Sequence, residues 1–232
     1  MMHSIISGDI IAYTSLNKNG KELFDHKTVI LTKILKDEFN VYARLIKGDY
    51  IECYVPETHE VLRVSLLIKS YIKSIANSII EKSDSTDERT YFFKKYGIRI
   101  AIGIGNLSRL DIKKGIIDGE AIYYSGRLLS KISTSDKNKI SIKNTLYIKT
   151  YEDELTDEFI PLLNLIDEIF NRSTAKQSEI LFYKLLGYDE KRIAKKIKRN
   201  QSTINQHSTS AGWNAIEKAV LRFENVVKEK IK

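Results

Sequence analysis

The chain has 232 residues, of which 42% are hydrophobic and 29% charged, and its formal net charge is +8. This is the composition of a folded globular protein, and the length allows one large domain or a domain of about 150 residues with a smaller one. One cysteine, Cys53, excludes an intrachain disulfide, and no apolar run approaches the roughly 20 residues that span a bilayer. We therefore expect a cytoplasmic protein without membrane association.

The first 150 residues alternate predicted strands and helices. β-rich runs predict strands at 4–11, 40–46, 50–55, 97–105 and 139–148. Apolar residues at helical spacing predict helices over 21–38, 60–80 and 120–132. The turn Lys47-Gly48-Asp49 predicts a hairpin, and the continuous apolar run 97–105 predicts an interior strand. The order of these elements is ferredoxin-like, so we expect an α+β sandwich of that kind over residues 1–150.

Two aspartates stand at the ends of these predicted strands. Asp9 closes the first strand, and Asp49 lies in the hairpin between the second and third. First and third strands are neighbours in a ferredoxin-like sheet, which would bring the carboxylates together. Such a pair repels unless a cation or proton lies between the two groups, and it commonly holds Mg²⁺ on a nucleotide. The alternative is that Asp49 is a turn residue and Asp9 only ends a loop.

Four segments together resemble the catalytic core of class III nucleotidyl cyclases. They are GDIIAYT at 8–14, KGD at 47–49, IRIAIGIG at 98–105 and GEAIYYSGRL at 119–128. The resemblance implies metal-binding aspartates at Asp9 and Asp49, with Ile10 in the same site, and a transition-state arginine at Arg127. It also implies Mg²⁺ or Mn²⁺ with a nucleotide as the cofactor class, although nothing in the residues themselves demands a cofactor.

The chain departs from the cyclase pattern at three positions. Tyr123 stands where those cyclases carry Asn, and their purine-selecting Lys and its Asp partner align with Ala43 and near Ile116. Loss of one preorganised charge-stabilising group commonly costs about 10²–10³ in rate. We therefore expect a degenerate domain that senses a nucleotide without turning it over. The alternative is an active cyclase using Asp9 and Asp49, including one specific for a pyrimidine nucleotide.

The excess positive charge lies entirely in the last quarter of the chain. Residues 172–232 hold 14 Lys and Arg against 6 Asp and Glu, whereas residues 1–171 hold 24 of each kind. Six cations fall within the nine residues from Lys191 to Arg199. Neutralising phosphates with such a cluster releases counterions, which favours a nucleic-acid contact. Between the two parts, residues 151–171 are acidic with helical apolar spacing and predict a connecting helix.

Residues 172–232 carry the element order of a helix-turn-helix domain. Helices are predicted over 177–186, 190–197 and 201–210, and a last amphipathic helix follows Asn214. Asp189 and Asn200 are expected to cap the second and third helices. Trp213 begins the apolar stripe of the last helix, so we place it in the core. The motif has unusual turn residues, since Lys198 stands where Gly is common.

Nine residues of this module are predicted to contact double-stranded DNA. Lys191, Arg192, Lys195, Lys198 and Arg199 would bind phosphates, and Gln201, Ser202, Asn205 and Gln206 would contact bases. Two alternatives stay open: a helical appendage whose cations are merely solvated, and a tail that binds another protein. Because helix-turn-helix modules usually bind two half-sites, and class III cyclase-like domains pair, we expect a homodimer.

The two parts in combination resemble the SatD family of bacterial proteins. The segment QSTINQ at 201–206 and the segment AGWNAIE at 211–217 are the most specific part of that resemblance, which extends over nearly the whole chain. It implies a bacterial DNA-binding transcriptional regulator, with the cyclase alternative above still open.

Overall fold

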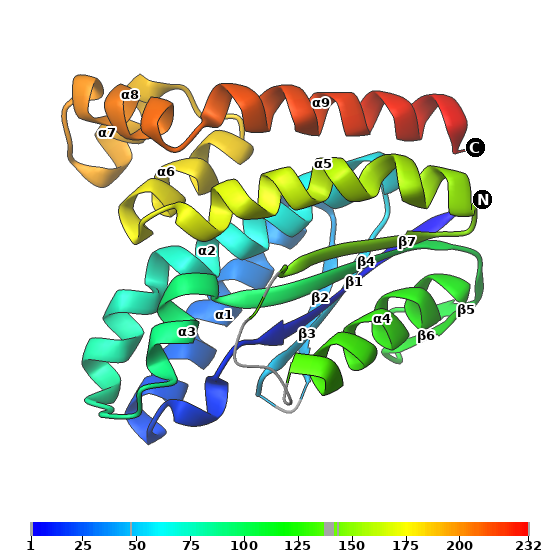
Figure 1. The fold of residues 1–232 in the computed structure, drawn as a ribbon, viewed down its shortest axis with the longest axis horizontal. Coiled ribbons are helices and arrows are strands. Elements are labelled where there is room, and N and C mark those ends of the chain that lie inside the picture. Colours follow the sequence, from blue (N-terminus) through cyan, green and yellow to red (C-terminus); the bar gives the residue numbers. More distant parts are fainter. Residues whose placement is uncertain (1, 47, 137–141, 143, 232) are drawn as a thin grey trace.

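The computed structural model describes residues 2–46, 48–136, 142 and 144–231. A mixed sheet lies at its centre, with helices on both faces and a helical layer along one side (Figure 1). Within the described residues the strand order is β2-β3-β1-β4-β7, with β4 and β7 parallel and the other neighbours antiparallel. The strands are β1 (His3–Ile10), β2 (Tyr42–Ile46), β3 (Tyr50–Val55), β4 (Ile98–Gly105) and β7 (Leu146–Thr150). The predicted mixed α+β class is confirmed.

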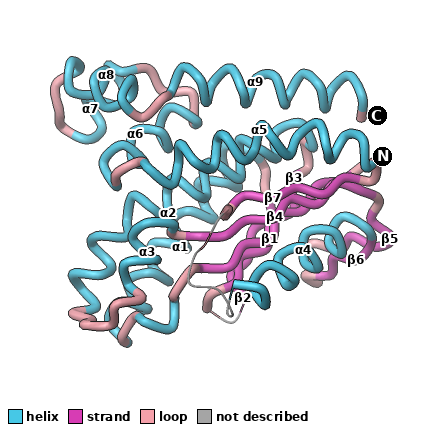
Figure 2. The backbone as a smooth tube through the Cα atoms, in the orientation of Figure 1, coloured by secondary structure: helices cyan, strands magenta, loops and turns pink. Residues whose placement is uncertain are grey.

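Different helices cover the two faces of the sheet. α1 (Lys18–Phe39) and α2 (Val61–Ser83) lie on one face, and α4 (Glu120–Asp136) lies on the other (Figure 2). Strand residues alternate between these faces: Ile6 packs in the large core with α2, whereas Ile5 packs in a smaller cluster with Ala121 of α4. A Cβ at Gly103 would lie 2.0 Å from the Ala121 carbonyl oxygen, so α4 rests directly on the backbone of β4.

A short α-helix and a hairpin were not anticipated. α3 (Thr90–Tyr96) is a seven-residue helix without a side-chain cap, and β5 (Leu107–Asp111) pairs with β6 (Ile116–Gly119) in a separate hairpin. The middle of β5 is exposed, so its sequence lacks the alternation that marks a half-buried strand. Of the strand expected over 139–148, the structure assigns only Leu146 onward to β7, whereas 139–141 and 143, like Lys47 of the hairpin, lie outside the described residues.

The C-terminal helices share the core of the sheet. α5 (Asp153–Arg172) follows β7, α6 (Ala175–Leu185) packs on α2, and α9 (Trp213–Lys230) runs along α5. Leu181 of α6 and Phe223 of α9 are fully buried in the same apolar cluster as Ile6 of β1. α7 (Glu190–Ile197) and α8 (Gln201–Ser210) project at one end, far from both termini (Figure 1). The elements before and after the expected domain boundary at residue 172 therefore share one apolar core.

Candidate nucleic-acid interface and the carboxylate pair

α7 and α8 form at the predicted residues, joined by a three-residue turn. The Asp189 side chain caps α7 by accepting a hydrogen bond from the Arg192 backbone N–H at 2.7 Å. α7 ends at Lys198, whose backbone is left-handed with φ 55°. Asn200 precedes α8 as expected, but its side chain makes no capping hydrogen bond. The cap prediction thus holds for Asp189 and is wrong for Asn200, which leaves the first N–H groups of α8 without a side-chain acceptor.

A small apolar cluster fixes the angle between the two helices. Ile193 and Ala194 of α7 pack against Ile204 of α8 and Ile180 of α6. Ala194 has the small side chain that a close helix crossing needs. Trp213 at the start of α9 is buried, as predicted, and the Lys184 ammonium lies 5.9 Å from its ring centroid.

All nine residues predicted to contact DNA are exposed, and the fold brings them to one end of the molecule. They are Lys191, Arg192 and Lys195 of α7, Lys198 and Arg199 of the turn, and Gln201, Ser202, Asn205 and Gln206 of α8. Three of the α8 residues, Gln201, Ser202 and Asn205, line an open hollow of about 530 Å³ together with Glu190. Lys184 donates a hydrogen bond to Glu190, which lowers the pKa of that carboxyl group and keeps it ionised and paired.

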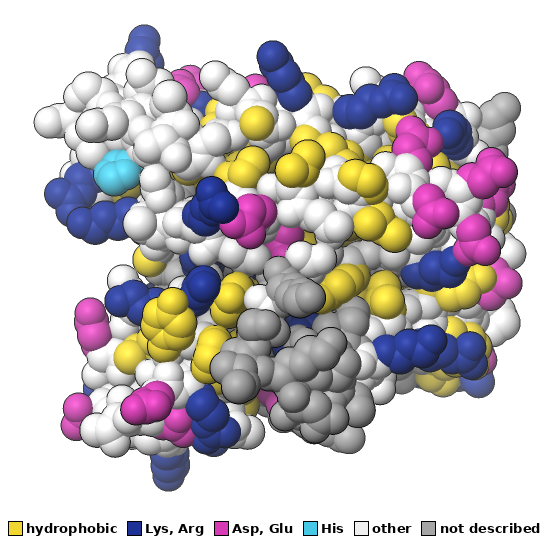
Figure 3. Space-filling view, viewed as in Figure 1, with side chains coloured by type: hydrophobic (Ala, Val, Ile, Leu, Met, Phe, Trp, Pro, Cys, Tyr) yellow, Lys and Arg dark blue, Asp and Glu magenta, His cyan; other side chains and the backbone are white. Residues whose placement is uncertain are grey.

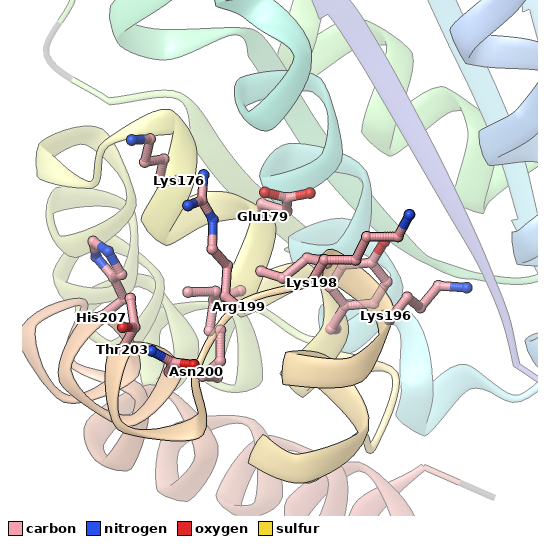
Figure 4. Close-up of a pocket in the computed structure, with 12 residues that line it drawn as sticks. Lys176, Glu179, Lys196, Lys198, Arg199, Asn200, Thr203 and His207 are labelled. Atoms are coloured by element: carbon pink, nitrogen blue, oxygen red, sulfur yellow. The ribbon is translucent and has the colours of Figure 1, made fainter.

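A second, more basic cleft lies on the other side of this helix pair. It has a volume of about 540 Å³ and is bounded by α6, the α7–α8 turn and α8 (Figure 4). Lys176, Glu179 and His207 belong to it, and sequence reasoning did not find them. Their separation along the chain gives no signal, because only the packing of α6 against α8 brings Lys176 near the turn. In the space-filling view the molecule is hollowed between the α7–α8 end and α1, with Lys and Arg side chains at the rim (Figure 3).

Asp9 and Asp49 meet at one end of the sheet. The Ile10 backbone N–H donates to the Asp49 carbonyl oxygen at 2.8 Å, which places the two aspartates on adjoining strand ends. Asp9 is already paired, since Nη1 of Arg99 on β4 donates to its Oδ2 at 2.9 Å. Burial, with the Asp25 and Asp49 carboxylates adding to it, raises the pKa of nearby Tyr13 to about 12, so this phenol stays protonated.

This donor set suits a divalent cation only incompletely. Carboxylate and carbonyl oxygens are the ligands that Mg²⁺ takes, but Arg99 already neutralises Asp9. Across the described part of the chain, no group of three or more His, Cys, Asp or Glu side chains is placed to hold a metal ion. Phosphate oxygens of a nucleotide would have to supply further ligands, and we derive no catalytic step through a metal. The metal site at Asp9, Ile10 and Asp49 stays a prediction.

Arg127 lies on the exposed surface of α4. Its guanidinium carbon is 5.3 Å from the centroid of the Tyr123 ring one turn earlier. The Tyr123 hydroxyl donates to Asp118 at 2.5 Å, and this hydrogen bond raises the pKa of the phenol. The residue that departs from the cyclase pattern is therefore built into a surface cluster with Arg127. The catalytic role of Arg127 stays a prediction.

Comparison with solved structures gives partial overlaps with TM-scores below 0.5. No protein-family model matches the chain, and no curated protein does. Solved structures that overlap it include a bacterial light-regulated adenylyl cyclase, at 18% identity over 63% of this chain and 74% of that chain with a TM-score of 0.41. A guanylyl cyclase follows at 9% identity, 64% and 74% coverage and a TM-score of 0.39. The catalytic core of a rhodopsin-guanylyl cyclase with converted specificity overlaps at 16% identity, 56% and 71% coverage and a TM-score of 0.33. At these scores the likeness assigns no activity to this chain.

Among the residues that the structure describes, no helix is both long and apolar enough to cross a membrane.

Proposed function

We propose that the protein is a DNA-binding transcriptional regulator in which α6 to α8 form a helix-turn-helix and the sheet forms a degenerate nucleotidyl cyclase-like sensing domain. The observation that carries the proposal is the α7–α8 pair. One small cluster around Ile193 and Ile204 holds a helix with a polar, uncharged outer face beside a strongly cationic helix and turn. Amide and hydroxyl side chains suit base edges, and the flanking cations suit phosphates.

The turn between the helices supports the same reading of the module. Three residues separate α7 from α8, the spacing typical of a helix-turn-helix. The module stands at the end of the molecule remote from both termini (Figure 1). A homodimer bound to two half-sites and membership of the SatD family belong to this proposal, as does a cytoplasmic location.

The sheet supports the cyclase-like part through its strand order. β2-β3-β1-β4 with alternating directions is the order of a ferredoxin-like sheet, and β7 extends its edge. The ion pair between Asp9 and Arg99, and the departure at Tyr123, favour sensing over catalysis in this domain.

Fluorescence anisotropy of the full chain on a random-sequence duplex, repeated over a range of salt concentrations, tests DNA binding. We expect the logarithm of the binding constant to fall linearly with the logarithm of salt concentration. The double variant Lys191→Gln/Lys195→Gln should reduce the slope by about 1.8, because each phosphate contact contributes about 0.9. Both side chains are exposed, so the fold should be kept.

The matched control is Lys33→Gln/Lys36→Gln on α1, which removes the same charge from exposed positions outside the module. It should leave the salt slope unchanged. Equal loss in the two double variants would mean that net charge alone binds DNA. Absence of salt-dependent binding would favour a protein-interaction tail and overturn the proposal.

A second candidate function, an active nucleotidyl cyclase, rests on the adjoining positions of Asp9 and Asp49. Incubation with each of the four nucleoside triphosphates and Mg²⁺ or Mn²⁺, followed by mass spectrometry, tests it. A cyclic product that disappears in Asp49→Ala would establish this activity. If no triphosphate gives a product, the role of the sheet domain is restricted to ligand sensing or to scaffolding.

A further inference from the structure

We propose that the cleft between α6 and the α7–α8 turn binds a small phosphate ester, at a site separate from the base-facing side of α8. The site does not depend on the proposed DNA binding. Its volume of about 540 Å³ is that of a small-ligand pocket. Its walls are formed by α6, by the end of α7 with the following turn, and by α8. A bound ligand would therefore contact all three parts of the module.

The charge of the cleft selects an anion. Lys176 of α6, Lys198 and Arg199 of the turn, and His207 of α8 line it. In Figure 4 the Arg199 guanidinium lies between the Lys176 side chain and the Glu179 carboxylate, whereas Lys198 extends away on the far side of Glu179. Among the ion pairs of the described residues, none engages Lys176 or Arg199, although Glu179 lies close enough to Arg199 to act through its charge. Two neighbouring cations that are not held in an ion pair suit a phosphate group.

Glu179 is the one carboxylate among the described residues that line the cleft. Burial raises its pKa, although the nearby Arg199 acts in the opposite direction. Its negative charge weakens the binding of an anion, so removal of that charge should strengthen it. An affinity that rises when the Glu179 charge is removed, and falls when Lys176 or Arg199 loses its charge, would indicate that the cleft binds an anion.

The start of α8 adds positive potential to the same cleft. Asn200 and Thr203 line it, and the Asn200 side chain does not cap the helix. The first backbone N–H groups of α8 therefore keep their partial positive charge near the Arg199 guanidinium.

The cleft and the base-facing side lie on nearly opposite sides of α8. At about 100° per residue, Thr203 and His207 point about 160° away from Gln201 and Asn205. The hollow beside Gln201 is lined by different residues from the basic cleft. An anion in the cleft would therefore leave the predicted base-contacting side chains uncovered.

The residues that line a neighbouring hollow indicate the chemical character of the ligand beyond its phosphate group. This hollow of about 480 Å³ shares Glu179, Tyr183 and Lys196 with the basic cleft. It continues past Phe182 to Tyr71 and Ile75 of α2. A phosphate held by Arg199 would thus place an aromatic or apolar body against α2 of the sheet domain. The ligand class is a phosphate ester with such a body.

Isothermal titration of the full chain with inorganic phosphate and with phenyl phosphate tests the site. We expect saturable binding of both, with phenyl phosphate the tighter. Arg199→Gln and Lys176→Gln should each weaken binding about tenfold, because each removes one charge-assisted contact. Glu179→Gln should tighten binding. Lys218→Gln, an exposed cation of α9 outside both the cleft and the predicted DNA contacts, is the matched control and should leave phosphate binding unchanged.

Three results would overturn the proposal: no saturable binding of either probe, equal weakening in Lys218→Gln, or weaker binding in Glu179→Gln. If neither probe binds and Arg199→Gln removes duplex binding instead, the cleft is a contact for the DNA backbone. Duplex binding is measured separately, so failure of the DNA proposal with phosphate binding intact remains a distinguishable outcome.

Discussion

Nζ of Lys69 lies 3.1 Å from Oδ1 of Asp167, and the two side chains are 0% and 1% exposed. The pair joins α2, which covers the sheet, to α5, which leads into the C-terminal helices. Thr145 completes the network: its backbone N–H and hydroxyl donate to Asp167, and its hydroxyl accepts from Lys69. Buried charges are tolerated only with such partners. The two parts of the chain are therefore joined by a charged contact as well as by a common apolar core.

Breaking this pair should destabilise the whole protein. Lys69→Met leaves the buried Asp167 without its ammonium partner, so we expect the free energy of unfolding to fall by about 3–5 kcal/mol in urea titrations. The double variant Lys69→Met/Asp167→Leu removes both charges and should recover part of that loss. A fall of less than about 1 kcal/mol in the single variant would show that water or a shifted side chain replaces the partner.

Lys73 should give the protein a stability that rises with pH. Its ammonium donates to the Phe170 and Asn171 carbonyls at the end of α5. Burial, with Lys69 and Lys95 adding to it and Asp167 opposing, lowers the pKa of Lys73 to about 7. From about pH 7 to about 10 the folded state then binds fewer protons at this group than the unfolded state does. The free energy of unfolding should therefore rise across that window, by at most about 1.4 kcal/mol per pH unit.

Urea titrations of the wild type and Lys73→Met at several pH values measure this effect. Lys69 also has a pKa lowered chiefly by burial and contributes with the same sign, so the difference between the two proteins is the quantity to compare. The wild type should show the steeper rise. Parallel curves would mean that Lys73 titrates at its ordinary pKa in the folded protein.

Gly103 should not tolerate a side chain. Its Cβ would lie 2.0 Å from the Ala121 carbonyl and 2.8 Å from the Ser125 backbone nitrogen, so α4 would have to move. We expect Gly103→Ala to cost about 1–3 kcal/mol or more of unfolding free energy. Gly126→Ala on α4 is the control, since nothing lies within 4 Å of its added Cβ, and it should stabilise by about 0.5–1 kcal/mol. Similar losses in both variants would contradict the close approach.

The elements that the sequence predicts best are those with their own local signals. α7 and α8 begin and end at the expected residues because Asp189 is a good cap and the apolar positions Ile193 and Ile204 are isolated among polar ones. The β5–β6 hairpin has no such signal, since its middle strand residues are exposed. Its pairing is a tertiary effect that propensity does not encode.

The candidate sites also differ in how far the sequence predicts them. Exposure of the nine predicted DNA-contacting residues follows from their places on α7, the turn and α8. The partner of Asp9 does not, because Arg99 lies within an apolar run that predicts a core strand, and only the register of β1 with β4 pairs the two. The basic cleft likewise needs Lys176 and Arg199 from separate helices.

Lys198 offers a test that separates folding from binding in the turn. Its left-handed backbone, with φ 55°, costs a non-glycine residue about 1 kcal/mol, and glycine relieves that cost. Lys198→Gly should therefore raise the free energy of unfolding relative to Lys198→Ala, which keeps the strained backbone. Both variants remove the same cation, so both should reduce the salt slope of DNA binding by about 0.9. Urea titration and anisotropy on the two proteins give the comparison. A glycine variant no more stable than the alanine variant would contradict strain at this turn, whereas unequal salt slopes would mean that the turn conformation itself positions the DNA contacts.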